Sequence, residues 1–282
     1  MFQFCSKFFI SITLLIALCV DANAQYFYKD IWTNQQLTKE FSILKNENIK
    51  YVSVKSFEDD GEPSDGFFCE KKIDKDFTKS EMISRSYITN QSLLVGYYNE
   101  KGWITKTVDS TQTSLTTSEY AYDNKGRIIL ITNFTKANGD AGGITETHQY
   151  IYNTAGKPEK MIKRKNNIDV STINFTLDDK GNTIDEQEII KGRKGRKFFY
   201  YYDDKNRLTD VVHYNARVKR LLPDYMYEYT QQGQIKQMIS TDDNSSNYYV
   251  WKYSYNEQRL RDSEKCFSKE KRLLGSIQYL YK

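Results

Sequence analysis

The sequence predicts an all-β protein, an antiparallel meander of β-hairpin repeats that forms one wide, twisted or curled sheet. Three observations support this prediction. A tyrosine followed by a short polar turn recurs about every 26 residues. The segments that flank each turn are rich in β-branched and aromatic residues, which favour strands. The chain also has 23 tyrosines, only 3 prolines and a mean hydropathy of −0.72, which is typical of long strands with half-wet faces.

The repeat is defined by its anchor residue, a tyrosine in every unit but one. The anchors are Tyr98, Tyr122, Tyr152, Leu177, Tyr202, Tyr229, Tyr255 and Tyr281. Near-even spacing with the same turn chemistry indicates internal repeats, each of them a strand, a turn and a second strand. Seven hairpins of this kind would give about 14 strands, and a sheet that wide twists and tends to curl.

The residues after each anchor predict a tight hairpin turn. In the second unit, Asp123 can accept hydrogen bonds from the backbone of the turn, and Gly126 can take the left-handed conformation of a type I turn with a G1 bulge. Asn206 replaces this glycine once, and asparagine is the next-best residue there. Arg127 and Arg207 follow two of the turns, where each could lie against a cross-strand ring.

The first 24 residues are predicted to be an export signal. Lys7 precedes an apolar run over residues 8–20, and Ala22-Asn23-Ala24 offers small residues at a signal-peptidase site, so cleavage is expected before Gln25. The alternative is a lipid anchor at Cys19. The expected location is exported: periplasmic, on the outer surface or extracellular.

Residues 25–95 repeat poorly and are predicted to cap the first edge strand of a repeat domain that covers residues 96–282. Leu37, Phe41 and Leu44 have helical spacing, so this segment contains either a short helix or further hairpins. Cys69 and Cys266 remain after the signal is removed. They could pair in an oxidising compartment, but in an elongated array their distance favours two separate thiols, or one buried and one reactive thiol.

Two units resemble the YD repeat of the RHS and teneurin families. They are Tyr122-Asp123-Asn124-Lys125-Gly126-Arg127-Ile128 and Tyr202-Asp203-Asp204-Lys205-Asn206-Arg207-Leu208. The resemblance implies a β-hairpin spiral, and the chain is also similar to small secreted bacterial YD-like proteins of unknown function. The other units lose the aspartate or the arginine, and their number is too small for the closed shell of long family members. An open sheet is therefore expected.

The sequence offers no catalytic, cofactor or metal motif, and we expect no enzyme activity. His148 and His213 have no metal spacing and are expected on the sheet surface. Nucleophile-elbow, Walker and dinucleotide-binding patterns are missing from the sequence. Paired carboxylates such as Asp178-Asp179 and Asp203-Asp204 are turn residues by their position, with Ca²⁺ binding as the alternative.

The connections at the other end of the hairpins are basic, which predicts a positive rim opposite a negative rim of turn aspartates. The candidate polyanion-binding residues are Lys191, Arg193, Lys194, Arg196, Lys197, Arg217, Lys219 and Arg220. A row of cations spaced by one hairpin could bind an acidic polysaccharide or another anionic polymer. The function expected is thus a non-catalytic surface or binding scaffold whose partner is an acidic polysaccharide or another envelope protein.

The alternative function is neutral-carbohydrate binding by tyrosine ladders. Tyrosines two residues apart share one face of a strand and could stack on sugar rings. The candidate residues are Tyr120, Tyr122, Tyr150, Tyr152, Tyr200 and Tyr202. Salt separates the two hypotheses, because only ionic binding weakens steeply as the salt concentration rises.

Overall fold

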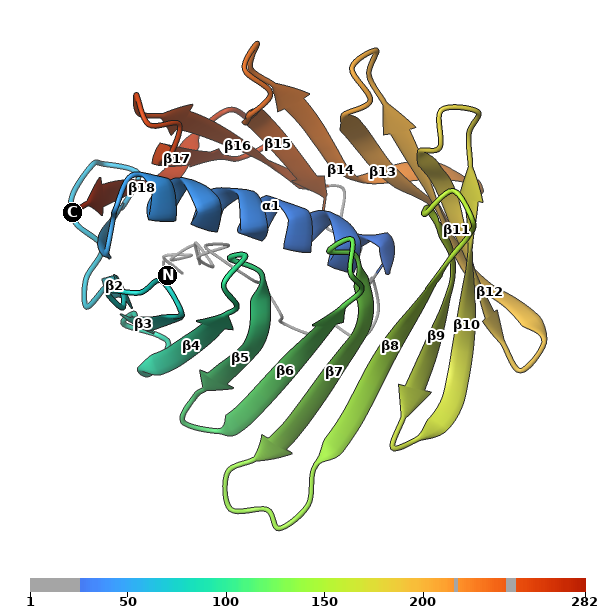
Figure 1. Cartoon of the computed structure of the whole chain (residues 1–282). Coiled ribbons are helices and arrows are strands. Elements are labelled where there is room, and N and C mark those ends of the chain that lie inside the picture. The colour runs from blue at the N-terminus through green and yellow to red at the C-terminus, as the bar shows by residue number, and fades with distance from the viewer. Residues whose placement is uncertain (1–25, 216–217, 242–246) are drawn as a thin grey trace, which may run out of the picture.

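The computed structural model describes residues 26–215, 218–241 and 247–282, and these form a closed antiparallel barrel around one helix (Figure 1). The predicted export signal, with Cys5 and Cys19, lies outside the described residues, as does Arg217. The elements in chain order are α1 (Tyr28–Asn46), β1 (Tyr51–Phe57), β2 (Phe68–Ile73), β3 (Lys79–Arg85), β4 (Ser92–Tyr98), β5 (Ile104–Ser110), β6 (Ser114–Tyr122), β7 (Ile128–Ala137), β8 (Ile144–Tyr152), β9 (Pro158–Lys165), β10 (Ile168–Leu177), β11 (Thr183–Ile190), β12 (Arg193–Tyr202), β13 (Leu208–Asn215), β14 (Arg220–Tyr229), β15 (Ile235–Thr241), β16 (Tyr248–Tyr255), β17 (Arg261–Phe267) and β18 (Leu273–Tyr281).

The all-β meander is confirmed, but the predicted open sheet is wrong. Each strand pairs with its neighbours in sequence, and β1 pairs both with β2 and with β18, so the 18 strands close into a ring. Val54 faces Cys69 on one side and Tyr279 on the other. Closure is favourable because it satisfies the backbone N–H and C=O groups that an edge strand would leave unpaired. The ring has no edge for residues 26–95 to cap. These residues supply α1, β1 to β3 and the first half of β4 instead.

The tyrosine turns have the predicted conformation. The N–H of Gly126 donates to the carbonyl of Asp123 at 3.0 Å, and the N–H of Asp123 donates to the carbonyl of Arg127 at 3.0 Å. The Asp123 carboxylate accepts from the N–H groups of Lys125 and Arg127. Gly126 has φ +80° and Asn206 has φ +58°, which is the left-handed region that the turn requires.

A related turn, one residue longer than the tyrosine turns, escaped the repeat count. It joins β2 to β3, where the N–H of Phe77 donates to the carbonyl of Asp74 and the N–H of Asp74 donates to the carbonyl of Lys79. Phe77 holds the left-handed position with φ +56°, in place of glycine or asparagine. Because a phenylalanine there is rare, the sequence pattern hid the turn, and this is one reason why about 14 strands were expected in place of 18.

The tyrosines tie each repeat to the one before it. In six units the hydroxyl of the anchor tyrosine donates to the carbonyl of the residue that begins an odd-numbered strand of the preceding unit, at 2.6–2.8 Å. The pairs are Tyr122–Ile104, Tyr152–Ile128, Tyr202–Thr183, Tyr229–Leu208, Tyr255–Ile235 and Tyr281–Arg261. Each bond of this kind contributes about 1 kcal/mol to stability, so the regular spacing of the anchor along this chain has a direct structural role in joining neighbouring hairpins.

Cation–π contacts reinforce the same ties. The guanidinium of Arg127 lies 4.5 Å from the ring centroid of Tyr152, and that of Arg207 lies 4.6 Å from the centroid of Tyr229. Each arginine also pairs with the aspartate of its own turn, Asp123 or Asp203. The predicted contact of these arginines with a neighbouring ring is confirmed, and it places the charges of this end of the barrel in contact with one another.

α1 lies inside the barrel, close to the end where the tyrosine turns are (Figure 1). Trp32 packs on Tyr227 of β14 with ring centroids 5.2 Å apart, while the amide of Asn34 donates to the hydroxyl of Tyr122 of β6 at 2.8 Å. The helix therefore contacts opposite walls and fills the lumen at its level. Within the part of the chain that the structure describes, no helix has the length and apolarity needed to cross a membrane.

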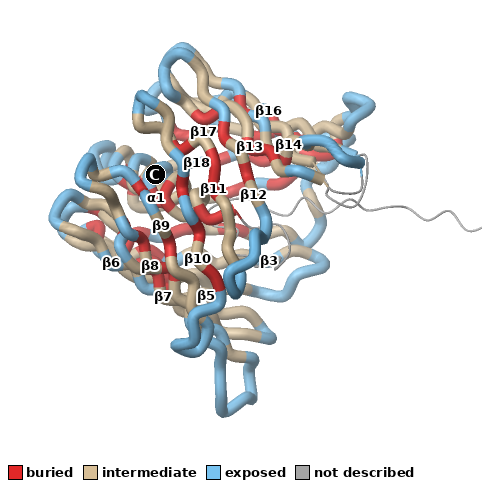
Figure 2. The backbone as a smooth tube through the Cα atoms, turned by 90° about the vertical axis from the view of Figure 1, so that its right-hand side faces the viewer, coloured by how far each residue is buried: buried red, intermediate tan, exposed pale blue. Residues whose placement is uncertain are grey.

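The apolar core is formed between α1 and the inner face of the strands. Phe27 and Ile31 pack against a cluster on β7 to β10, and Phe41 and Leu44 pack against a cluster on β1, β2 and β18. The hairpin ends are exposed, and the buried residues lie on the strands between them (Figure 2). Next to the tyrosine turns, burial reaches the first residue of β5, β7 and β13. A short helix was one of the two alternatives for this segment, and the structure contains it together with further hairpins.

The two cysteines of the described chain are buried and free. Cys69 is on β2 and Cys266 is on β17, so β1 and β18 separate them. Three strand spacings of about 4.8 Å place them roughly 14 Å apart, twice the separation that a disulfide tolerates. The two ends of the chain meet in the ring, so the distance between the chain ends does not keep the thiols apart. They are unpaired because two strands lie between them.

Candidate functional site

The densest positive charge lies on the hairpin that joins β11 and β12. Lys191 and Gly192 both have positive φ, at +48° and +78°, and Ile190 pairs with Arg193, so the turn has only two residues. The flanking side chains therefore stand at the tip. Lys191, Arg193, Lys194 and Arg196 are exposed, and no ion pair with another described residue engages any of these four.

Lys197 differs from these four residues. Its ammonium lies 3.2 Å from a carboxylate oxygen of Asp185 and 4.9 Å from the ring centroid of Phe199. It is half-buried against the outer wall of the barrel. This predicted member of the site is therefore partly neutralised and contributes less to a binding surface.

The two neighbouring hairpins extend the positive surface. Lys165 lies at the end of β9, and Lys219 and Arg220 lie at the start of β14; all three are exposed. Adjacent hairpins are about 10 Å apart, which is two strand spacings. We refer to Lys165, Lys191, Arg193, Lys194, Arg196, Lys219 and Arg220 as the basic arc.

The rim that carries the basic arc is polarised and not uniformly positive. The connection from β1 to β2, at the same end of the barrel, carries five exposed carboxylates: Glu58, Asp59, Asp60, Glu62 and Asp65. At the opposite end, Asp123 and Asp203 are paired with arginines. The expected contrast between a positive and a negative rim is thus replaced by a positive arc and an acidic loop on one rim.

The six candidate glycan-stacking tyrosines belong to the lumen. Tyr150 and Tyr200 are only 3% and 2% exposed. Tyr120, Tyr122, Tyr152 and Tyr202 are half-buried, and all but Tyr202 pack against the cluster that contains Phe27 and Ile31. The hydroxyl of Tyr150 donates to the carbonyl of Phe27 and to Asp30 of α1. These rings face the helix and one another, so the described arrangement presents no ladder to a sugar.

A second group of polar residues fastens the first turn of α1 to the wall. His148 Nδ1 lies 2.6 Å from Asp30 Oδ2, and His148 Nε2 lies 3.0 Å from Glu146 Oε1. Glu146 also pairs with the ammonium of Lys163 at 3.0 Å. The carboxylate of Glu186 accepts hydrogen bonds from the N–H groups of Phe27 and Tyr28, both at 2.8 Å. We call His148, Asp30, Glu146 and Glu186 the helix latch.

The pKa values in the helix latch are shifted by burial and by charge. Burial lowers the pKa of His148, but the carboxylates of Asp30 and Glu146 outweigh this and raise it to about 9. Burial raises the pKa of Glu146, but hydrogen bonds from His148 and Lys163 lower it to about 2. Burial raises the pKa of Glu186 to about 7, although two backbone N–H groups oppose the rise. A protonated His148 between two carboxylates is the charge arrangement that this geometry stabilises.

The helix latch was not predicted from the sequence. His148 was expected on the sheet surface, but its side chain is only 2% exposed. His213 is half-buried and lies 2.9 Å from Asp224. The alternation of Glu146, His148 and Tyr150 places all three on one face of a strand, which is the only local signal. Their partner Asp30 is 118 residues away from His148 in the chain.

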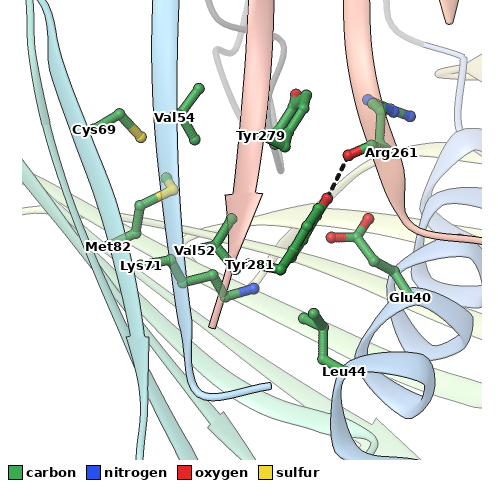
Figure 3. A pocket seen from close by; sticks show the side chains of 10 residues that line it. All are labelled: Glu40, Leu44, Val52, Val54, Cys69, Lys71, Met82, Arg261, Tyr279 and Tyr281. Carbon is green, nitrogen blue, oxygen red and sulfur yellow. Dashed lines mark hydrogen bonds between the residues drawn. The ribbon is translucent and has the colours of Figure 1, made fainter. Parts of the chain in front are cut away.

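A small cavity lies between the second half of α1 and the strands β1, β2, β3, β17 and β18 (Figure 3). Its volume of about 30 Å³ is enough for one or two water molecules. Glu40 and Lys71 line it beside Tyr281, whose hydroxyl donates to the carbonyl of Arg261. The cavity suits buried water that hydrates these charges and is too small for an organic ligand.

Fold and site together define a closed β-hairpin-repeat barrel that holds a helix and carries a basic arc on one rim. No family model matches the chain, and no curated protein matches it. The similar solved structures include a porin-like protein from Bacteroides uniformis ATCC 8492, with 10% identity and a TM-score of 0.38, covering 83% of this chain and 98% of that one. They also include the TcdB2-TccC3-TEV structure, with 9% identity, a TM-score of 0.34 and coverage of 76% and 12%. A Photorhabdus luminescens Tc holotoxin pore matches with 10% identity, a TM-score of 0.28 and coverage of 73% and 16%.

Proposed function

We propose that this chain is an exported, non-catalytic binding protein that captures a polyanion through the basic arc. The observation that carries the proposal is the β11–β12 hairpin, where four exposed cations stand together without an ion pair among the described residues. Charges held in this way have no structural role in the barrel and keep their full attraction for a ligand. Hairpins about 10 Å apart can follow the repeating charges of a polymer such as an acidic polysaccharide.

The stability of the barrel does not depend on these cations. The ring closes through strand pairing, and neighbouring repeats are joined by tyrosine hydroxyls and arginine contacts at the opposite end. The alternative, stacking of neutral sugars on the six tyrosines, would require α1 to leave the lumen. Export remains part of the proposal, because the apolar run and the small residues before Gln25 are typical of a cleaved signal.

The test is retention of the protein, residues 25–282, on an immobilised acidic polysaccharide across a salt gradient. The binding variant changes Lys191, Arg193, Lys194 and Arg196 to Ser. A matched control changes four lysines at the tyrosine turns, Lys101, Lys125, Lys180 and Lys205, to Ser and so alters net charge equally.

We expect the wild-type protein and the control to elute late, and the binding variant to elute early with a smaller dependence on salt. Equal elution of the two variants would show that retention follows net charge and would reject the basic arc as the site. A wild-type protein that passes through at low salt would reject polyanion binding altogether.

A further inference from the structure

Exposed apolar side chains lie at the hairpin tips that carry the basic arc and at the neighbouring β7–β8 tip. On the same rim, Tyr87 and Ile88 at the β3–β4 tip are also exposed, at 74% and 49%. The tips from β7 to β14 carry Phe134, Ile144, Ile168, Val170, Ile190, Val218 and Leu221, which are 37–71% exposed. Ile168, at the tip next to Lys165, is the most exposed of these at 71%. Among the described residues, the tyrosine turns themselves carry no exposed large apolar side chain, whereas Ile129, Ile151 and Tyr201 flank these turns on the outer wall and are 37–48% exposed.

Apolar and basic residues alternate along these tips. Ile190 precedes Lys191, and Val218 and Leu221 enclose Lys219 and Arg220. A soluble polymer of acidic sugars would need only the cations. The apolar side chains at these tips expose apolar surface to water that no described part of the barrel covers. This exposure is unfavourable unless the side chains are buried in an apolar environment on binding.

We propose that the polyanion is presented by a lipid layer, so that the basic arc binds anionic headgroups while the apolar tips enter the acyl boundary beneath them. This inference rests on the proposed function and specifies its partner as a lipid surface with phosphate headgroups. Basic residues near such a surface are attracted electrostatically, and apolar side chains beside them add burial that does not depend on salt. The two-residue turn at Lys191 and Gly192 holds the β11–β12 tip rigid, which favours shallow insertion of side chains over refolding of a segment.

The experiment compares co-sedimentation with vesicles of equimolar phosphatidylcholine and phosphatidylglycerol with retention on the acidic polysaccharide. The tip variant changes Ile168, Ile190, Val218 and Leu221 to Ser. Its matched control changes Ile129, Ile151, Tyr201 and Met226 to Ser on the outer wall, where the exposure is 37–48%. Vesicles of phosphatidylcholine alone serve as the neutral surface.

We expect the tip variant to bind the anionic vesicles about tenfold more weakly or worse, and to keep its retention on the polysaccharide. The outer-wall control should bind both as the wild-type protein does. A second readout is Ile168→Trp, whose emission should shift to the blue on anionic vesicles and stay unchanged on neutral ones.

The outcomes separate the two proposals. Retention on the polysaccharide with no vesicle binding, or with vesicle binding that the tip variant leaves unchanged, would overturn the lipid inference and leave the proposed function intact. Failure of the wild-type protein to bind either the polysaccharide or the anionic vesicles would overturn both. Equal loss of vesicle binding in the tip variant and the outer-wall control would also overturn the inference, because insertion would not be confined to the tips.

Discussion

Replacing His148 with glutamine should remove most of the pH dependence of the stability of this protein between pH 6 and pH 9. His148 is buried between the carboxylates of Asp30 on α1 and Glu146 on its own strand. Lys163 faces the same cluster through Glu146, and the hydroxyl of Tyr150 donates to Asp30. Glutamine can keep one hydrogen bond at this position but cannot take up the proton.

The size of the effect follows from the shift of the pKa of His148, from an ordinary value of 6.5 to about 9 in the folded protein. A raised pKa means that the stabilisation is complete below about pH 6.5 and is lost as the pH rises through about 9. At 1.36 kcal/mol per pH unit, this difference corresponds to about 3 kcal/mol. Glu186 acts in the same direction, because burial raises its pKa from 4.5 to about 7, so the variant should retain a smaller loss of about 1 kcal/mol.

The assay is urea unfolding at pH 6 and pH 9, followed by tryptophan fluorescence, because Trp32 packs on Tyr227 and reports the position of α1. The control is Tyr150→Phe, which removes the hydroxyl that donates to Asp30 and to the carbonyl of Phe27 without removing a group that titrates in this pH range. It should lose about 1 kcal/mol at both pH values and keep the wild-type slope. A wild-type stability that is flat or rises from pH 6 to pH 9, or a His148→Gln variant with the wild-type slope, would refute the reasoning.

Three further predictions concern the repeat and the thiols. Tyr229→Phe keeps the ring but removes the hydroxyl bond to the preceding repeat, so it should lower the free energy of unfolding by about 1 kcal/mol; the exposed Tyr201→Phe should change it by less than about 0.5 kcal/mol. Gly126→Ala should lower the free energy of unfolding by about 2 kcal/mol, and Gly233→Ala by about 1 kcal/mol. Both glycines have positive φ, but only at Gly126 would the added Cβ lie 2.5 Å from a neighbouring ring. Equal losses of stability in the two variants would contradict this contact. The two buried cysteines, whose pKa values burial raises to about 11 and about 12, should react with a thiol reagent at pH 8 only in urea, and rapid labelling of the native protein would contradict their burial.

The hairpin turns could be predicted because their determinants are local. An aspartate that caps the turn and a glycine or asparagine in the left-handed position lie within four residues of each other, as Asp123 and Gly126 do. The turn at Phe77 was missed because its residue type does not report its conformation. The same locality explains why the tyrosines were recognised as anchors, although the carbonyl groups that they bind lie 18 to 24 residues away.

Closure of the ring could not be read from the repeat. It depends on the twist summed over 18 strands and on the pairing of β1 with β18, two segments at opposite ends of the chain. The helix latch depends on contacts of the same long range, since Glu186 lies 159 residues from Phe27. Local patterns gave the faces of the strands, but they could not show that the face with the tyrosines encloses a helix.

The two ends of the barrel differ in how their charged side chains are engaged. At the tyrosine turns, the charges of Asp123 and Arg127 satisfy each other, and the tyrosine hydroxyls join neighbouring repeats. At the other rim, the tip formed by Ile190, Lys191 and Arg193 contributes exposed apolar and basic groups that the fold does not use. Strand pairing around the ring, the tyrosine hydroxyl bonds between repeats and the packing of α1 already stabilise the barrel. The side chains at these tips are therefore not needed for the fold. An exposed apolar and basic surface that the fold does not need supports the proposed binding role, and the variants at the β11–β12 tip test that role directly.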